Sequence, residues 1–172
     1  MQHASLITPD FVRTMAKYNG VMNRRLYDAA FRLSDEERRK DRGAFWSSIH
    51  GTFNHLLWGD TMWMSRFEPA KWQKPAVTQK ESATLIADFA ELTKAREDAD
   101  RKIEAWAAGV TENWVAGDLT WFSGSAGREM RMPASFLLVH FFNHQTHHRG
   151  QAHALITAAG EATGDTDLFL VL

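Results

Sequence analysis

The chain has 172 residues, a formal net charge of −1, 44% hydrophobic residues and no cysteine. This size predicts a single domain spanning residues 1–172 with one sizeable core, and the balanced charge gives no footprint for nucleic acid or an anionic membrane. The lack of cysteine excludes a disulfide scaffold, a thiolate metal site and a cysteine nucleophile. No apolar run approaches the ~20 residues that cross a bilayer, and no secretion signal opens the chain, so we expect a cytoplasmic protein.

Helix signals begin near the N-terminus. Thr8 is placed to act as an N-cap, Pro9 occupies the first helical position, and apolar residues then recur every three or four positions as far as Ala30. The sequence SDEE at residues 34–37 fits a capping box that starts a short helical turn. From Gly43 to about Phe67 no proline interrupts an apolar-rich segment, which we interpret as the second long helix.

The second half of the chain contains two more long helices. The sequence KPAVTQKES (residues 74–82) is typical of a loop, and the third helix is predicted from Ser82 to about Ala107. The sequence SGSAG (residues 123–127) between two alternating segments predicts a β-hairpin. Pro133 then starts a fourth helix that Gly160 ends.

These elements predict an all-α fold, a four-helix bundle with a short β-hairpin before the fourth helix. Functional sites in such bundles lie between facing helices. The apolar sequence DLFLVL at residues 167–172 is expected to pack back on the bundle.

Four of the eight histidines lie in the sequence FFNHQTHHRGQAH at residues 141–153. Residues four apart on a helix lie one turn apart and about 40° from each other, so His140, His144 and His148 form a stripe, with His147 beside it. Two imidazoles at this spacing can reach one metal ion. The alternative, a polar helix surface, is weakened because most of this helix is apolar. We therefore predict a metal site here.

A third ligand has to come from another helix. His3 lies close to the N-terminus, whereas His50 and His55 fall in the second helix, about 140° apart, and cannot share a face. Periodicity does not choose between them, because this helix is apolar nearly all round. Asp60 falls in its densest apolar sector, and a buried carboxylate needs a partner: Arg149 or the second nitrogen of a ligand histidine. Otherwise Asp60 is an exposed turn residue at a kink.

Several known site types are missing from the sequence. No glutamate lies three residues before a histidine, which argues against the Glu-x-x-His pairs of di-iron bundles. There is no HExxH motif, which argues against a zincin protease. The SGSAG turn lacks the lysine and the strand-to-helix setting of a phosphate loop.

The sequences FNHLLWGDTMW (residues 53–63) and HFFNHQTHHRGQ (residues 140–151) together resemble the DinB-like family of bacterial four-helix-bundle proteins, named for DNA-damage inducibility. The likeness covers nearly the whole chain, and its fourth-helix signature is fairly specific. In that family one histidine of the second helix and an H-x3-H pair of the fourth bind a divalent metal. The resemblance therefore implies His55, His144 and His148 as ligands. Three imidazoles suit zinc, nickel, copper or iron, and we expect zinc or nickel.

The resemblance leaves other roles open. It makes His140 and His147 neighbours of the site that support the ligands, contact substrate or simply pack, and Asp60 and Arg149 are candidates for the same supporting roles. We expect Gly150 to compensate its cost in a helix, roughly 1 kcal/mol, by close packing on a neighbouring helix.

Two functional interpretations compete. The first is a metal-dependent enzyme of thiol transferase or hydrolase type, because the wider superfamily contains transferases that use low-molecular-weight thiols such as bacillithiol or mycothiol. Its partner would be a small-molecule substrate. The second is a non-catalytic, stress-related protein with a structural metal. The resemblance also implies a homodimer.

Overall fold

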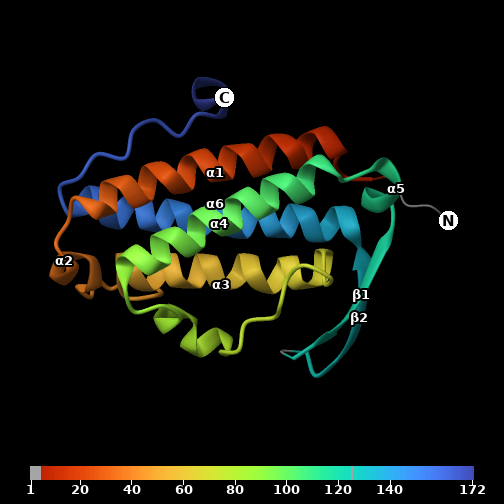
Figure 1. Ribbon diagram of the computed structural model, residues 1–172, viewed down its shortest axis with the longest axis horizontal. Coiled ribbons are helices and arrows are strands. Elements are labelled where there is room, and N and C mark those ends of the chain that lie inside the picture. Colours follow the sequence, from red (N-terminus) through yellow and green to blue (C-terminus); the bar gives the residue numbers. More distant parts are fainter. Residues whose placement is uncertain (1–4, 125) are drawn as a thin grey trace.

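The structure is a computed structural model that describes residues 5–124 and 126–172, and it is mostly helical. Long helices run side by side along its longest axis, with a hairpin at one end (Figure 1). The elements are α1 (Pro9–Phe31), α2 (Asp35–Arg39), α3 (Ile49–Phe67), the 3-10 helix η1 (Gln79–Thr84), α4 (Phe89–Ala108), α5 (Glu112–Val115), β1 (Asp118–Ser123), β2 (Arg128–Pro133), α6 (Ala134–Ala158) and α7 (Leu168–Val171).

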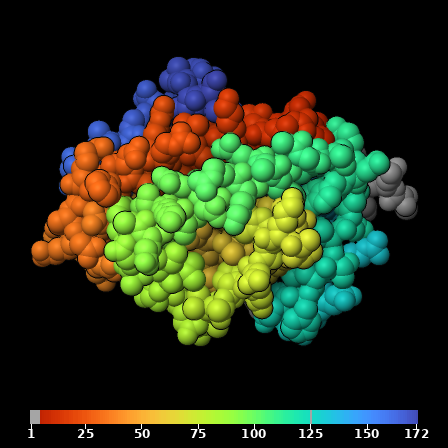
Figure 2. All heavy atoms as spheres, in the orientation of Figure 1, coloured from red at the N-terminus to blue at the C-terminus, as the bar shows by residue number. Residues whose placement is uncertain are grey.

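The four long helices enclose the hydrophobic core. Helix α1 packs against α4 and α6, and α3 packs against the same two helices, so each long helix has two long neighbours. Helices α1 and α4 and the segment after α3 form the face shown in Figure 2. The largest completely buried side chains include Phe53, Leu92, Leu138, Phe141 and Phe142. Burial of side chains of this size contributes roughly 1.5–3 kcal/mol each, which makes this core the main source of stability.

The starts of the first helices are set by local side-chain caps. The Thr8 hydroxyl accepts a hydrogen bond from Phe11 N at 3.2 Å, as predicted. Ser34 caps α2 in the same way. Ser48 caps α3 by accepting from Gly51 N at 3.0 Å, so the helix begins only at Ile49 and the residues before it form a loop. A side-chain oxygen at the N-cap satisfies a backbone donor that the helix cannot.

The predicted start of the third long helix is wrong. Helix α4 begins at Phe89, because the Asp88 carboxylate caps it by accepting from Glu91 N at 2.8 Å. Residues 79–84 instead form η1, whose start is fixed by Thr78 N donating to the Glu81 carboxylate at 2.9 Å. Ser82 is therefore part of a separate short helix that packs on α3.

The hairpin and the last long helix follow the sequence prediction. Strands β1 and β2 pair antiparallel, with Asp118 opposite Pro133 and Ser123 opposite Arg128. Helix α6 follows at once and ends before Gly160, which has a φ of 94° that suits glycine. The hairpin contacts α3 and α6 at the end of the molecule where α3 ends and α6 begins.

The C-terminal residues return to the bundle, as predicted, but they do not bury their side chains against it. Helix α7 contacts α1, but none of its side chains is buried and Phe169 is 81% exposed. Among the described residues, no helix combines the length and the apolar character needed to cross a membrane.

Candidate metal centre

Helices α3 and α6 pack against each other and contribute histidines to one cluster. One ring nitrogen each of His55, His144 and His148 lies within 4.8 Å of the other two. His55 Nε2 is 3.2 Å from His144 Nε2. Two nitrogens that bind one zinc ion at ~2.0–2.1 Å with tetrahedral geometry lie about 3.3 Å apart, so this spacing fits a shared ion. The structure thus brings together the three residues that the resemblance implied.

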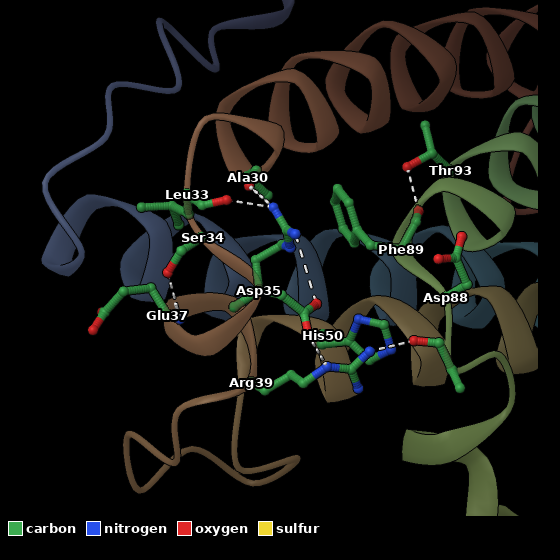
Figure 3. A network of polar contacts seen from close by, with 12 residues as sticks. Ala30, Leu33, Ser34, Asp35, Glu37, Arg39, His50, Asp88, Phe89 and Thr93 are labelled. Carbon is green, nitrogen blue, oxygen red and sulfur yellow. Dashed lines mark hydrogen bonds and ion pairs between the residues drawn. The ribbon is translucent and has the colours of Figure 1, made fainter.

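His50, the alternative on α3, lies in a different environment. Its Nε2 donates to the carbonyl oxygen of Ile86 at 2.9 Å, and its ring lies beside Phe89. Figure 3 shows it beside the polar contacts of Asp35 and Arg39. His50 Nε2 is therefore occupied by a backbone contact. His3 lies outside the described residues.

His55 is oriented by a hydroxyl that sequence reasoning missed. Its Nδ1 lies 2.9 Å from Ser82 Oγ. The Ser82 hydroxyl donates its own hydrogen to the carbonyl oxygen of Gln79 at 2.7 Å, so it can only accept from His55. His55 Nδ1 consequently carries the proton, and Nε2 presents a lone pair to the cluster. Ser82 was interpreted as the start of a long helix, which left no signal that it reaches the site.

His148 is fixed in the same tautomer by a neighbour on its own helix. Its Nδ1 lies 2.7 Å from the amide oxygen of Gln151, which accepts only, so Nδ1 is the donor and Nε2 keeps its lone pair. The amide nitrogen of Gln151 points to His147 at 3.2 Å, consistent with this orientation of the amide. Hydrogen bonds of this kind to the second ring nitrogen are typical of metal-binding histidines.

The ring of His144 occupies space that a glycine leaves. A Cβ atom added to Gly59 would lie 2.7 Å from His144 Cε1, closer than any ordinary contact. Gly59 is one turn after His55 on α3, so it brings the backbone of that helix close to His144 of α6. Gly150 behaves differently from our expectation: nothing lies within 4 Å of its corresponding position, so it does not pack closely on another helix.

Burial keeps the imidazoles of the cluster neutral. Desolvation, followed by the neighbouring His148, lowers the pKa of His55 to about 3, and the same causes lower the pKa of His144 to about 3. The pKa of His148 is also lowered, mainly by burial. Neutral imidazoles are the form that binds metal, so the folded chain presents the cluster ready for a cation at neutral pH.

Two tryptophans hold the His55 ring from its faces. The Trp46 ring stacks on it with centroids 3.9 Å apart and an interplanar angle of 20°, and the Trp58 ring lies 5.8 Å away at the same angle. Trp46 comes from the loop before α3, in which Ser47 adopts a φ of 62°, a conformation uncommon outside glycine. Its ring centroid is also 6.5 Å from that of His148. The cluster is thus bordered by aromatic surface.

Comparison with known sequences assigns the chain to a family. The sequence model of the DinB family matches residues 1–171. The chain belongs to the DinB family. Protein DinB from Bacillus subtilis (strain 168) is 24% identical to this chain over 169 residues, which cover 95% of this chain and 94% of that protein. The match extends over every element of the fold, so the family assignment concerns the whole chain.

Two further histidines of α6, His140 and His147, lie at the edge of the cluster. His140 is exposed, with its ring 6.1 Å from that of His144 and 5.0 Å from that of Trp63. The Arg66 guanidinium lies 4.3 Å from the centre of the Trp63 ring. His147 is exposed and contacts the Gln151 side chain. Neither belongs to the three-histidine cluster.

Asp60 is buried, but its partner differs from both candidates. Its carboxylate accepts from Arg96 Nη1 of α4 at 2.6 Å, and Arg96 also pairs with Asp100 at 2.7 Å. Asp60 is 1% exposed, which overturns the alternative of an exposed turn residue. The partner was missed because Arg96 follows Asp60 by 36 residues, and no local pattern links α3 to α4.

Arg149 is buried without a carboxylate contact. It is 5% exposed, and the one hydrogen bond of its guanidinium to a side chain among the described residues reaches Thr146 Oγ1 at 3.3 Å. Burial lowers its pKa to about 10. Asp60 and Arg149 therefore belong to the buried polar interior of this DinB-family chain, and their hydrogen bonds go to Arg96 and Thr146 rather than to a histidine of the cluster.

Proposed function

We propose that this DinB-family chain binds one divalent metal ion, zinc or nickel, through Nε2 of His55, His144 and His148, and that it uses the ion in a thiol-transfer or hydrolytic reaction. The observation that carries the proposal is the convergence of neutral imidazoles from α3 and α6. Ser82 and Gln151 hold two of them in the tautomer in which Nδ1 carries the proton and Nε2 keeps its lone pair. The packing of α1, α4, α3 and α6 supports the assignment of a four-helix bundle with its site between facing helices.

Three neutral ligands suit a catalytic role. A divalent ion held in this way keeps its positive charge and lowers the pKa of a coordinated water or thiol. The protein's part is to orient the imidazoles, through Ser82 and Gln151, and to border the cluster with the rings of Trp46 and Trp58. Aromatic surface there limits water and offers an apolar face to a small substrate.

Elimination within the chain leaves a small thiol or a water molecule as the nucleophile. The sequence has no cysteine and no HExxH glutamate, so the chain itself supplies neither a thiolate nor the base of a zincin. The resemblance favours the thiol, because the wider superfamily includes transferases that use low-molecular-weight thiols beside proteins with no established reaction. Exposed His140, beside His144 and Trp63, is the residue placed to exchange a proton with a small molecule at the edge of the site.

The second candidate function is a metal that only joins α3 to α6. The specific observation in its favour is burial, since His55 is 1% exposed and His148 is 8% exposed. Structural sites are closed by protein ligands, whereas catalytic sites keep a position for a small molecule. Counting the exchangeable positions on the bound metal separates these functions.

Cobalt substitution tests the choice. Cobalt-loaded protein is titrated with bacillithiol or mycothiol, and a thiolate-to-cobalt charge-transfer band in the near ultraviolet is expected. Because the chain has no cysteine, the band must come from the added thiol. The His144→Ala/His148→Ala variant is the control and should give no band. If neither thiol changes the cobalt spectrum, thiol transfer is excluded and water activation or a structural metal takes its place.

Assembly and location belong to the same proposal. We propose a cytoplasmic homodimer that binds neither nucleic acid nor membrane, in keeping with the balanced charge and the family resemblance. Analytical ultracentrifugation of the metal-loaded chain should give twice the monomer mass, and a monomer at micromolar concentration would contradict the dimer.

A further inference from the structure

Arg149 of α6 is a buried cation whose donors are not used up by the protein. Its Nη1 atom is buried and has no hydrogen-bond partner among the described residues, and its Nη2 atom makes only the 3.3 Å contact to Thr146. The two carboxylates that attract it, Asp60 and Asp100, are both held by Arg96. An arginine side chain offers five N–H donors and cannot escape the cost of burial by losing its proton, so it calls for an anionic partner.

A cavity lies next to this side chain. It has a volume of about 240 Å³ and is lined by residues of α1 and α6 and by Thr166 of the segment that returns toward α1. Its lining contains Arg149 and His153 but no aspartate or glutamate. Met22 and Leu26 of α1 supply an apolar part of the wall.

The cavity is reachable from solvent. Thr146, Gly150 and Thr166 line it and are exposed, whereas Arg149, Met22 and Leu26 are buried. Nothing lies within 4 Å of the position where a Cβ of Gly150 would be, which leaves the approach along α6 open. The Tyr18 hydroxyl donates to the carbonyl oxygen of Thr166, so two residues of the cavity wall are joined to each other.

We propose that this cavity binds a small organic carboxylate, with Arg149 as its anchor and Met22 and Leu26 around its aliphatic part. A guanidinium matches a carboxylate in a planar, two-bond geometry. One arginine balances a single negative charge, and the apolar wall has no use in binding inorganic phosphate. The site is separate from the three-histidine cluster, because consecutive residues His148 and Arg149 point about 100° apart around the helix axis.

Calorimetric titration of the metal-loaded chain tests the proposal, with butyrate, acetate and inorganic phosphate as probes in chloride buffer. Butyrate should bind saturably, and acetate and phosphate should bind at least about tenfold more weakly, since each carbon buried against the wall adds affinity. Arg149→Gln should weaken butyrate binding at least about tenfold, as loss of a charge-assisted bond predicts. Arg24→Gln, which replaces an exposed arginine of α1, is the matched control and should bind butyrate as the wild type does.

A second variant covers the case in which Arg149→Gln fails to fold. Gly150→Leu keeps Arg149, improves helix propensity and places a side chain into the approach to the cavity, so it should fold and should weaken butyrate binding at least about tenfold. The proposal is overturned if no probe gives a saturable signal, if Gly150→Leu binds butyrate like the wild type, or if folded Arg149→Gln does so. Tighter binding of phosphate than of butyrate would overturn the carboxylate assignment.

Discussion

His55 acquires its role from the atoms around it. Ser82 fixes the proton on Nδ1, stacked tryptophans fix the ring plane, and burial holds the pKa at about 3. Each of these contacts comes from a different part of the chain: η1, the loop before α3 and α3 itself. The same imidazole on an exposed helix would rotate freely and would be partly protonated near its ordinary pKa of ~6.5.

Removal of the Ser82 hydroxyl tests this orientation. Ser82→Ala leaves His55 Nδ1–H without its acceptor, and loss of such a contact costs about 10–100-fold in metal affinity. Affinity is measured by competition with a chromogenic chelator. The control is Ser65→Ala, which removes a hydroxyl that donates to a backbone carbonyl on the same α3 helix. Equal affinities for the two variants would show that Ser82 does not orient the ligand.

Gly59 and Gly150 offer a matched pair of glycine substitutions. Gly59→Ala places a methyl group 2.7 Å from His144 Cε1, so the ring must shift, whereas Gly150→Ala meets nothing within 4 Å. Both changes raise helix propensity by roughly 1 kcal/mol. We therefore expect Gly59→Ala to weaken metal binding and Gly150→Ala to keep it, with a small gain in stability. Unchanged metal affinity in Gly59→Ala would contradict the close approach of α3 to His144.

At the scale of elements, α3 is joined to α4 by buried charges. Arg96 bonds Asp60 and Asp100, and all three side chains are largely shielded from solvent. Replacing Arg96 with methionine would leave two carboxylates without their cation, and breaking a buried pair in this way costs about 3–5 kcal/mol. Urea unfolding of the metal-free protein measures the loss.

The exposed pair of Arg101 and Asp98 on α4 is the control for that measurement. The Arg101 side chain is 70% exposed, and surface pairs contribute about 0–1 kcal/mol. Arg101→Met should therefore unfold close to the wild type. A similar small loss for Arg96→Met would mean that the buried pairs add nothing net to the packing of α3 on α4.

The long helices, apart from the start of α4, were predictable from sequence, whereas the paths of η1 and of the loop before α3 were not. Thr8 and Pro9 mark the start of α1 because capping depends on neighbours within one turn, and the same holds for Gly160 at the end of α6. The H-x3-H spacing predicted that His144 and His148 share a face. In contrast, Ser82 and Trp46 reach His55 through the paths of η1 and the loop before α3, which tertiary packing decides.

For the same reason, the sequence indicated that Asp60 is buried but did not indicate its partner. The apolar surroundings of Asp60 indicated burial, but its partner Arg96 lies on a helix that sequence periodicity could not orient toward α3. The choice of His55 over His50 likewise came from the resemblance, and the structure explains it because only His55 points to α6.

At the scale of the whole molecule, the buried histidines couple folding to pH. The pKa of His144 is about 3 in the folded chain and about 6.5 when unfolded. Below pH ~6.5 the unfolded chain takes up a proton that the folded chain does not, so the free energy of unfolding falls as pH drops from ~6.5 toward 3, by up to ~1.4 kcal/mol per pH unit for each such histidine.

This pH dependence is measured on metal-free protein by urea unfolding between pH 7 and pH 5. His144→Asn should flatten the decline, because asparagine takes up no proton in either state. His147→Asn changes an exposed histidine of the same helix and should keep the wild-type slope. A decline that is identical in all three proteins would contradict the burial of a neutral His144.

The proposed function requires one ion bound between α3 and α6. Metal analysis of the purified chain, by inductively coupled plasma mass spectrometry, measures this directly for the wild type, for His144→Ala/His148→Ala and for the control His147→Ala/His153→Ala, which removes two histidines of α6 outside the cluster. We predict one divalent ion per chain in the wild type and the control, and none in the variant that lacks both α6 ligands. Stoichiometric metal in that variant, or its loss from the control, would contradict the three-histidine centre.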